Sequence, residues 1–539
     1  MKRTRKLPIF ILIGCLWAFQ ASAQQTYKAA SCSPADVQTA INTEIAHAVD
    51  GDIIAIPAGT CKWTGTSQVS GRFTTSVTIQ GAGAMSATTG GTSTTGTDQT
   101  IIIDEVNHGS GGVNQNISIQ ALAGKSFRLT GIAFFQDSLS TPANNGMIAI
   151  GGGSTSVRLD HNHFNMIAFS HELNIGGVYG VADHNYFQAT GGVGGLYFEN
   201  NNNGAHGTGD EAWNQPDQWG TVNFFFVEDN LFDDHGNTDS HDGARYVFRH
   251  NTTIARQTHT PTMSNHGIHD RGRASRAIEV YQNTWTSTLA PGNGGPTTSN
   301  NGGAEIYWGN TINGYQRAVD VDYTCKDTST YGECGINPSN GWGLCNTTTT
   351  TAWSNGSACI DGPGRGQGDL LSGSFPNVCN ITLNPACNVF TGQWPRQALS
   401  PIYIWNSAFT PASGYSSTPF VGNGSAGVAV GNRDYFQQFG TSAEPGSFNG
   451  TAGVGTGTVN PTNAGAYAGA PNCSNANSPG SYPGPGYWNS TTQHLWVCTA
   501  LNAWKDYYTP YTYPHPLTQS QSTSATTVAP PTNLGATVN

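Results

Sequence analysis

Charged residues and methionine are scarce in this sequence. Only 10% of its 539 residues are Asp, Glu, Lys or Arg, and methionine occurs 5 times. Long stretches with helical periodicity are also missing, whereas glycine is abundant at 69 residues. This profile is not that of a cytosolic helical protein, and it favours an extracellular all-β protein.

Basic residues become rarer still when the N-terminal leader is set aside. Four of the 22 Lys and Arg lie in the first six residues, which leaves 18 against 33 Asp and Glu and a net charge of −15. Such an acidic chain is not expected to bind nucleic acid. No apolar run after the leader reaches membrane-spanning length. No Cys-x-x-Cys pair occurs either, which argues against a structural zinc site.

The leader itself indicates export. A basic start is followed by the apolar run from Ile9 to Phe19 and by the small residues Ala21-Ser22-Ala23, so we expect a signal peptide over residues 1–23. The protein is therefore predicted to be secreted or periplasmic. An alternative is lipid anchoring at Cys15, because Leu12-Ile13-Gly14-Cys15 resembles a bacterial lipoprotein signal.

The exported chain has ten cysteines, since one of the 11 lies in the leader. An even number in an exported protein predicts disulfides. We expect the local pairs Cys32–Cys61 and Cys473–Cys498. The other six allow 15 connectivities, which the sequence does not resolve; they are Cys325, Cys334, Cys345, Cys359, Cys379 and Cys387.

A short unit with a polar turn recurs along the chain, as in Val157–Phe164 (VRLDHNHF) and Val181–Phe187 (VADHNYF). Its asparagines align at Asn162, Asn185, Asn230, Asn251, Asn283 and Asn310. The gaps between them are 23, 45, 21, 32 and 27, and we interpret the 45 as two steps with one unmarked coil between. A period of about 22 predicts a solenoid of short parallel strands with a ladder of turn asparagines, which also tolerate αL geometry. A leucine-rich consensus is absent, and a propeller blade needs about 40 residues.

The N-terminal segments complete a family pattern. Apolar residues at helical spacing predict a helix over 35–49 with Ser33 as its cap, Pro34 at its first position, and Val37, Ala40, Ile41, Ile45 and Ala48 on its apolar face. This helix, the strand GDIIAIPAGT, the strand SVTIQGAG and the Asp-His-Asn-x-Phe units resemble the right-handed parallel β-helix superfamily of pectate and pectin lyases, from about Ser33 to Phe409.

The predicted fold is therefore all-β, a right-handed parallel β-helix with an N-terminal capping helix and a small disulfide-pinned C-terminal β region. We expect a cap over residues 24–50, the β-helix over 51–410 with a Cys-rich insertion at 323–394, a C-terminal β and aromatic region over 411–517, and a flexible tail over 518–539. The aromatic segment 504–517 is expected to pack against the protein, at the far end of the solenoid, rather than to bind sugar.

Arginine and histidine gather between Asp239 and Arg276, a window with six arginines and five of the 15 histidines. Because neighbouring coils of a β-helix lie about 4.8 Å apart, residues of successive coils can line one groove. Removing the C5 proton of a uronic acid needs a base, an acid and a cation for the carboxylate, and His and Arg supply these. We predict catalytic roles for His241, Asp242, His266, Arg271 and Arg273, and substrate binding by Asp239, Arg245, Arg249, His269 and Arg276.

Local motifs refine the resemblance. Asp233-Asp234 precedes Asn237-Thr238-Asp239, the reverse of the order in polygalacturonases, which argues against hydrolysis. Asp239-Ser240-His241-Asp242, followed by His266-Gly267, is similar to the Asp-Pro-His-Asp and His-Gly motifs of mannuronan C5-epimerases. Pectate lyases use calcium, and Asp229, Asp233 and Asp234 are candidate ligands for Ca²⁺ here.

We therefore expect a monomeric, secreted polysaccharide lyase that acts on an acidic polysaccharide. A C5-epimerase of the same fold is one alternative. A non-catalytic surface adhesin or glycan-binding β-helix protein is the other, because fold alone does not decide function.

Overall fold

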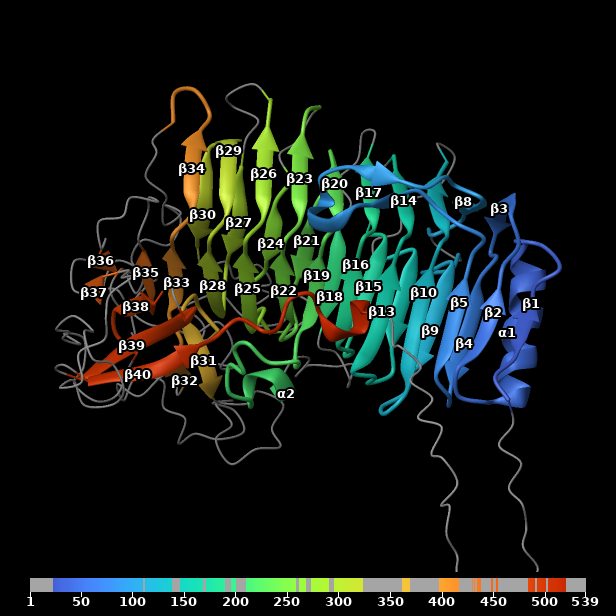
Figure 1. Cartoon of the computed structure of the whole chain (residues 1–539), viewed down its shortest axis with the longest axis horizontal. Coiled ribbons are helices and arrows are strands. Elements are labelled where there is room, and N and C mark those ends of the chain that lie inside the picture. Colours follow the sequence, from blue (N-terminus) through green and yellow to red (C-terminus); the bar gives the residue numbers. More distant parts are fainter. Residues whose placement is uncertain are drawn as a thin grey trace, which may run out of the picture.

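Three long parallel sheets wind around one elongated core (Figure 1). The computed structural model describes residues 23–109, 112–137, 146–167, 171–189, 195–199, 210–257, 261–267, 273–289, 295–322, 361–368, 397–415, 429, 431, 434–437, 447–448, 452–453, 483–489, 492–500 and 503–519. The predicted leader, the six central cysteines and the predicted tail beyond residue 519 lie outside these ranges. No helix of the described part is long and apolar enough to cross a membrane.

Sheet A has 12 strands. In spatial order they are β1 (Thr26–Lys28), β2 (Asp52–Ala55), β5 (Val77–Gln80), β10 (Ser126–Thr130), β13 (Ser156–Asp160), β16 (Gly180–Asp183), β19 (Phe225–Glu228), β22 (Arg245–Arg249), β25 (Ala277–Tyr281), β28 (Ala304–Trp308), β33 (Ile402–Trp405) and β35 (Tyr435–Gln437).

Sheet B has 10 strands. They are β3 (Gly59–Gly65), β8 (Thr100–Val106), β11 (Ala133–Gln136), β14 (His163–Met166), β17 (Tyr186–Ala189), β20 (Leu231–Asp233), β23 (Thr252–Ala255), β26 (Thr284–Ser287), β29 (Thr311–Tyr315) and β34 (Ala408–Pro411).

Sheet C has 9 strands. They are β4 (Val69–Phe73), β9 (Ile117–Ala121), β12 (Ile148–Gly151), β15 (Leu173–Gly176), β18 (Leu196–Glu199), β21 (Thr238–Ser240), β24 (Met263–Asn265), β27 (Pro296–Asn300) and β30 (Arg317–Val321).

The chain visits sheets A, B and C in turn, so each coil contributes one strand to each sheet and pairs in parallel with the coils before and after it. Alternate residues point into the bore, where like residues stack. Phe134, Phe164, Phe187 and Phe232 form one such row, with ring centroids 5.3, 5.0 and 4.7 Å apart. This architecture is a right-handed parallel β-helix, as predicted.

The predicted asparagine ladder runs along the corner between sheets A and B. Each asparagine side chain donates to the amide oxygen of the next, for example Asn185 Nδ2 to Asn230 Oδ1 at 3.0 Å and Asn230 Nδ2 to Asn251 Oδ1 at 3.0 Å. The left-handed residue of the turn is the one before each asparagine, for example His184 at φ 56° and Asp229 at φ 59°. The expectation that asparagine itself takes this conformation is therefore wrong. The asparagine amide is needed for the ladder, so the residue before it adopts the strained left-handed conformation.

The 45-residue gap is one coil, not two. Asn185 bonds directly to Asn230, and β16, β17 and β18 pair with β19, β20 and β21. The additional residues form an excursion between β18 and β19 that contains α2 (Asp210–Trp213). The prediction of an unmarked coil is wrong because a solenoid can insert residues at a corner without disturbing the ladder.

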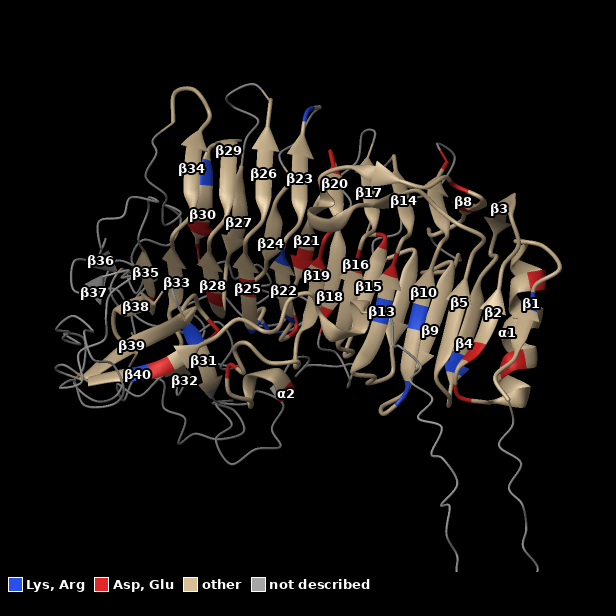
Figure 2. Cartoon of the chain, viewed as in Figure 1, with Lys and Arg blue, Asp and Glu red and all other residues tan. Residues whose placement is uncertain are grey.

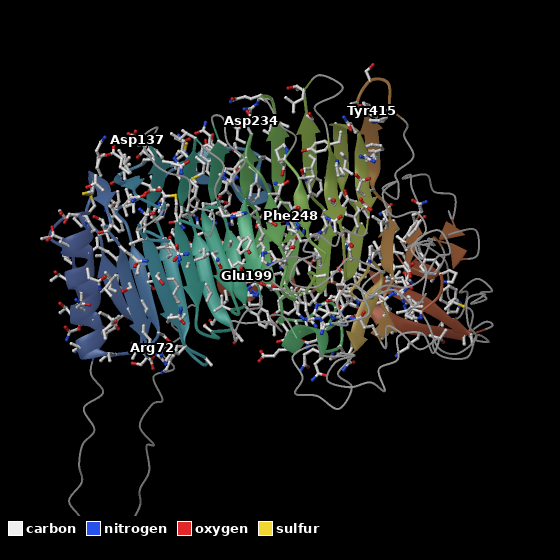
Figure 3. All side chains as sticks on the ribbon, turned by 180° about the vertical axis from the view of Figure 1, so that it is seen from behind. Arg72, Asp137, Glu199, Asp234, Phe248 and Tyr415 are labelled. Atoms are coloured by element: carbon white, nitrogen blue, oxygen red, sulfur yellow. A yellow bond between two sulfur atoms is a disulfide. The ribbon has the colours of Figure 1, made fainter. Side chains whose placement is uncertain are left out.

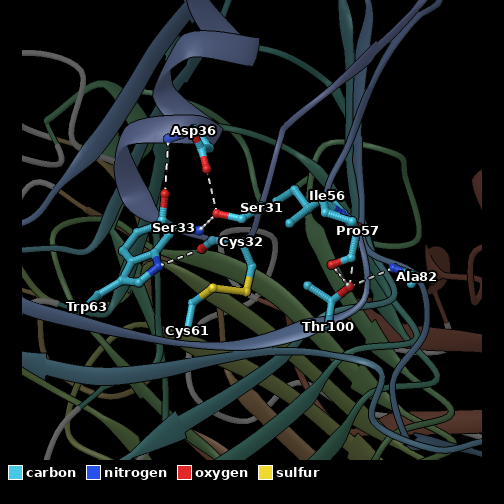
Figure 4. Close-up of a disulfide and its surroundings, with 10 residues drawn as sticks. All are labelled: Ser31, Cys32, Ser33, Asp36, Ile56, Pro57, Cys61, Trp63, Ala82 and Thr100. Atoms are coloured by element: carbon cyan, nitrogen blue, oxygen red, sulfur yellow. Dashed lines mark hydrogen bonds between the residues drawn. A yellow bond between two sulfur atoms is a disulfide. The ribbon is translucent and has the colours of Figure 1, made fainter.

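Helix α1 (Pro34–His47) covers the first coils, with Ser33 as its cap and Pro34 at its start, as predicted. Val37, Ala40 and Ile41 are buried, whereas Ile45 is 38% exposed and Glu44 is buried instead. Glu44 turns inward because the Thr75 hydroxyl donates to its carboxylate at 3.0 Å. The predicted Cys32–Cys61 disulfide joins the start of the helix to β3, beside Trp63 (Figure 4).

The C-terminal region lies along the outer face of sheet A (Figure 1). Strands β38 (Gly486–Asn489), β39 (His494–Ala500) and β40 (Ala503–Tyr508) form an antiparallel sheet. Residues 509–519, which we call the strap, continue to η4 (Pro516–Thr518), which contacts β13 and β16. The aromatic segment thus packs against the protein, as predicted, but along the side of the solenoid instead of at its end.

Cys498 is disulfide-bonded, and its predicted partner Cys473 lies outside the described residues. The remaining short elements are η1 (Thr89–Gly91) and three antiparallel pairs. These pairs are β6 (Ser86–Ala87) with β7 (Thr94–Thr95), β31 (Arg365–Gly368) with β32 (Gln397–Leu399), and β36 (Ser447–Phe448) with β37 (Ala452–Gly453).

Candidate functional site

The outer face of sheet C brings four of the predicted residues together: Asp239, His241, Asp242 and His266. Asp239 lies between Tyr197 of the preceding coil and Ser264 of the following one, and its neighbours Thr238 and Ser240 point into the bore. His241 and His266 come directly after β21 and β24, where their backbone N–H groups donate to Phe198 O at 3.2 Å and Ser240 O at 2.8 Å. The ladder of the sheet therefore continues one residue past each strand, and it aligns the two histidines.

Asp239 bridges two histidines. Its Oδ1 lies 2.8 Å from His266 Nε2, and its Oδ2 lies 3.1 Å from His171 Nε2. Burial opposes ionisation of Asp239, but the hydrogen bonds from His171 and His266 outweigh it and hold the pKa of this carboxyl well below its ordinary value. Asp239 is thus a permanent anion that fixes the orientation of two imidazoles. The side chain of His266 is 20% exposed and that of His171 is 8% exposed, so His266 is the more accessible ring.

Tyr197, His241 and Asp242 form a buried chain beside this bridge. The Tyr197 hydroxyl contacts His241 Nε2, and His241 Nδ1 lies 3.1 Å from Asp242 Oδ2. The Tyr197 ring packs between His171 and His241, with centroid distances of 4.7 and 4.8 Å. The tyrosine therefore connects the two clusters. We use the term proton-transfer cluster for His171, Tyr197, Asp239, His241, Asp242 and His266.

Asp242 owes its position to an unusual backbone bend. It has φ 54°, in the left-handed region, and its N–H donates to Arg273 O at 2.7 Å. The bend turns the chain from sheet C towards sheet A directly after His241. Asp is one of the few residues that tolerate this conformation, so its side chain can lie beside the preceding histidine.

The predicted arginines do not join this cluster. Arg245 and Arg249 lie on β22 in sheet A, a different face of the coil. Arg249 pairs with Glu228 and donates to the Tyr511 and Thr512 carbonyl oxygens of the strap at 2.7 and 2.9 Å. Arg245 donates to the carbonyl oxygens of Ala212, Pro216 and Asp217. Both are buried and hold other segments onto sheet A.

Arg273 and Arg276 are also buried. Arg273 pairs with Asp361 at 2.6 Å, Arg276 pairs with Asp217 at 2.6 Å, and both guanidinium groups stack on Trp213 of α2. The four arginines thus anchor excursions of the chain instead of facing the cluster. Proximity in sequence misled the prediction because a coil turns corners within a few residues. His269 and Arg271 lie outside the described residues.

Two members of the cluster, His171 and Tyr197, and its neighbour Glu199 were not predicted. Tyr197 and Glu199 alternate outward on β18, one coil before Asp239 and His241, and His171 precedes β15. The available signal was the alternation of Leu196-Tyr197-Phe198-Glu199 against Thr238-Asp239-Ser240-His241. The prediction of two coils within the 45-residue gap prevented these two segments from being aligned.

A separate hollow lies on the same outer face of sheet C, nearer the N-terminus, where Asn174 is paired in register with Tyr197. It has a volume of about 520 Å³ and is lined by small residues of β12 and β15 together with Arg72, Gln120 and Asn174. Figure 3 shows Glu199 midway along the solenoid and Arg72 nearer the end that carries α1. Charged residues also occur on sheet A, for example on β10 and β13 (Figure 2), so charge alone does not distinguish this face.

The acidic residues considered for calcium already have protein partners. Asp229 accepts hydrogen bonds from Gly90 N and Tyr513 Oη, Asp233 pairs with Arg256, and Asp234 accepts from Gln257 N at 3.0 Å. Within the described ranges, one group of side chains has the spacing of a metal site. It consists of Glu199, His241 and Asp242, whose ligand atoms all lie within 4.8 Å of one another.

Comparison with known proteins adds no evidence on the fold or the site. No protein-family model matches the chain, and neither a curated protein nor a solved structure is significantly similar to it.

Proposed function

We propose that the outer face of sheet C removes the C5 proton of a uronic acid unit in an acidic polysaccharide, and that the protein is a polysaccharide lyase. The observation that carries this proposal is the Asp239 carboxylate held between His171 and His266, at 3.1 and 2.8 Å. A carboxylate that orients an imidazole through one ring nitrogen makes the other nitrogen available for proton transfer.

The roles follow from accessibility. His266, the more exposed ring, is the base that takes the C5 proton. His171 is the acid that protonates the leaving oxygen, and its imidazolium charge also offsets the carboxylate next to C5. Asp239 orients both rings. Tyr197 and His241 are positioning residues: the Tyr197 ring packs against His171, and His241 packs against Tyr197.

The hollow lined by Arg72, Gln120 and Asn174 supports a polymeric substrate. It lies in line with the cluster on a face built from repeated coils, so a linear chain can occupy both at once. Arg72 can bind a carboxylate and the amide side chains can bind hydroxyls. The resemblance to pectate and pectin lyases and the epimerase-like Asp239–Asp242 segment agree with this class of substrate.

The test is incubation of the purified protein with pectate, alginate and other uronates. A lyase produces an unsaturated sugar, which is detected by its ultraviolet absorbance. The same reactions in deuterium oxide detect an epimerase, because C5 then exchanges its proton without any rise in absorbance. If the folded protein causes neither change with any uronate but still binds one, it is a glycan-binding protein and the proposal fails.

A pair of variants links the activity to the cluster. His266→Gln should abolish the reaction, whereas His184→Gln should not. His184 also contacts a carboxylate, with its Nδ1 2.9 Å from Asp183 Oδ2, but it lies at the corner between sheets A and B. Equal activities would show that the reaction occurs elsewhere.

A further inference from the structure

Glu199, His241 and Asp242 converge from two adjacent coils. Glu199 ends β18, and His241 and Asp242 follow β21, which pairs with β18. One ligand atom from each residue lies within 4.8 Å of the others, and His241 Nδ1 and Asp242 Oδ2 are 3.1 Å apart. Two atoms bound to one metal ion at about 2.0–2.2 Å are separated by a similar distance, so little movement is needed to enclose an ion.

Two of the three groups are carboxylates, which are ligands that metal cations accept together with imidazole. His241 and Asp242 are 2% and 1% exposed, so the Asp242 carboxylate is shielded from water. The Glu199 carboxylate makes no hydrogen bond or ion pair within the described part of the chain. Burial makes the negative charge of the Asp242 carboxylate costly unless hydrogen bonds or a cation compensate it, and a cation bound by the three groups would provide such compensation.

Tyr197 provides the support that a metal-bound histidine requires. Its hydroxyl contacts His241 Nε2, the ring nitrogen that faces away from Asp242. When Nε2–H donates to the Tyr197 oxygen, the lone pair of Nδ1 points towards Asp242 and Glu199. Metal-binding histidines commonly donate their second ring nitrogen in this way, which fixes the tautomer and the ring orientation.

We infer that Glu199, His241 and Asp242 bind a first-row transition-metal dication, such as Zn²⁺ or Mn²⁺. The cation takes the place of the proton between His241 Nδ1 and Asp242 Oδ2, and that proton is released to solvent. The imidazole nitrogen selects this class, because Ca²⁺ and Mg²⁺ prefer oxygen ligands alone. Three protein ligands leave at least one position of the ion open to water or to a substrate oxygen.

This inference goes beyond the proposed function, because metal binding requires neither a polysaccharide nor a reaction. If the proposed function also holds, the ion would lie next to the coil that carries Asp239 and would add positive charge on the face where the anchoring arginines of sheet A are absent.

The experiment is a calorimetric titration of the untagged, full-length protein after treatment with EDTA, using ZnCl₂, MnCl₂ and CaCl₂ separately. We expect one equivalent of Zn²⁺ or Mn²⁺ to bind and Ca²⁺ to bind much more weakly. Glu199→Gln should weaken binding by about tenfold or more, because it removes one ligand from a partly exposed position without disturbing the buried pair. Asp242→Asn should also weaken binding, and Asn tolerates the left-handed backbone of this position.

His184→Gln is the matched control, since His184 and Asp183 form a similar neighbouring pair but belong to no group with the spacing of a metal site among the described residues. Its affinity for Zn²⁺ should equal that of the wild type. Equal affinity in wild type and Glu199→Gln would overturn the inference, as would the absence of saturable binding or Ca²⁺ binding as tight as that of Zn²⁺. Circular dichroism of each metal-free variant establishes that it is folded. Because no substrate is used, the result does not depend on whether the proposed reaction occurs.

Discussion

The outer faces of sheets A and C use ionisable residues in opposite ways. On sheet A, Arg249, Arg273 and Arg276 are fully buried and each pairs with a carboxylate from another segment of the chain. On the outer face of sheet C, which also carries the hollow, Asp239 and His266 keep 24% and 20% of their side chains exposed. The comparison teaches that density of charge in the sequence does not by itself mark a reaction site. Burial and pairing decide whether a charged group can contact a ligand.

The largest expected effect is on stability, at Arg249 in sheet A. Arg249→Met removes the partner of buried Glu228 and both hydrogen bonds to the strap. Breaking a buried ion pair by removing one partner costs about 3–5 kcal/mol. The midpoint of denaturant unfolding should fall accordingly, while the proton-transfer cluster remains intact in the folded fraction. An unchanged midpoint would mean that the strap does not depend on this residue.

His266→Gln on sheet C should show the reverse. General acid–base groups contribute about 10²–10⁴-fold to a rate, so activity on the uronate substrate should fall by that range. Gln can still donate a hydrogen bond to the Asp239 carboxylate in place of the imidazole, so the unfolding midpoint should fall by much less than in Arg249→Met. If this variant loses stability and keeps its activity, the contrast between the two faces is wrong.

The two faces should also differ in their response to pH. Burial raises the pKa of Glu279 on β25 of sheet A from 4.5 to about 7, against the opposing hydrogen bond from Gly220 N. A carboxyl whose pKa is raised in the folded state stabilises the fold fully below the unfolded value, and this stability is lost as pH rises through the folded value. Stability from this group should therefore decline between pH 4.5 and about pH 7.

Glu279→Gln should reduce that decline, and unfolding midpoints at several pH values would measure it. Asp239 on sheet C has the opposite shift, so its contribution is lost only under strongly acidic conditions and does not interfere in this window. The same slope in wild type and Glu279→Gln would assign the decline to other groups.

The smallest expected effect concerns the exposed end of the strap. Tyr513 is 37% exposed, and its hydroxyl donates to Asp229 at 2.8 Å. Tyr513→Phe removes one hydrogen bond, which is worth about 0.5–1.5 kcal/mol. The midpoint should fall less than in Arg249→Met. An equal loss in the two variants would show that burial is not what distinguishes the anchoring arginine.

The fold was largely readable from the sequence because a solenoid repeats its own constraints. The asparagines recur at one corner, apolar residues alternate around them, and the Cys32–Cys61 pair is local. The site was readable in part. Asp239, His241 and His266 were expected to share a groove wall, and their side chains do lie together on sheet C.

The site residues that were placed wrongly or missed depended on where the chain bends from one sheet to the next. Arg245 lies only six residues after Asp239, yet the bend at Asp242 and Gly243 moves it from sheet C to sheet A. Tyr197 was missed for the opposite reason, because 42 residues separate it from Asp239 while the two are paired in register. Sequence spacing shows the step of the repeat, but an insertion at a corner changes which residues become neighbours.

The strap alters how the molecule should unfold. In an ideal repeat protein each coil contacts only the next, so a break can start anywhere and spread coil by coil. Here Tyr508, at the end of β40, contacts Trp308 on β28. The strap that follows contacts Arg249 on β22, and it reaches strands β16 and β13 through η4. These contacts join coils that are not neighbours in the solenoid. The middle of the solenoid should therefore melt as one cooperative block, and the last coils should not loosen independently of it.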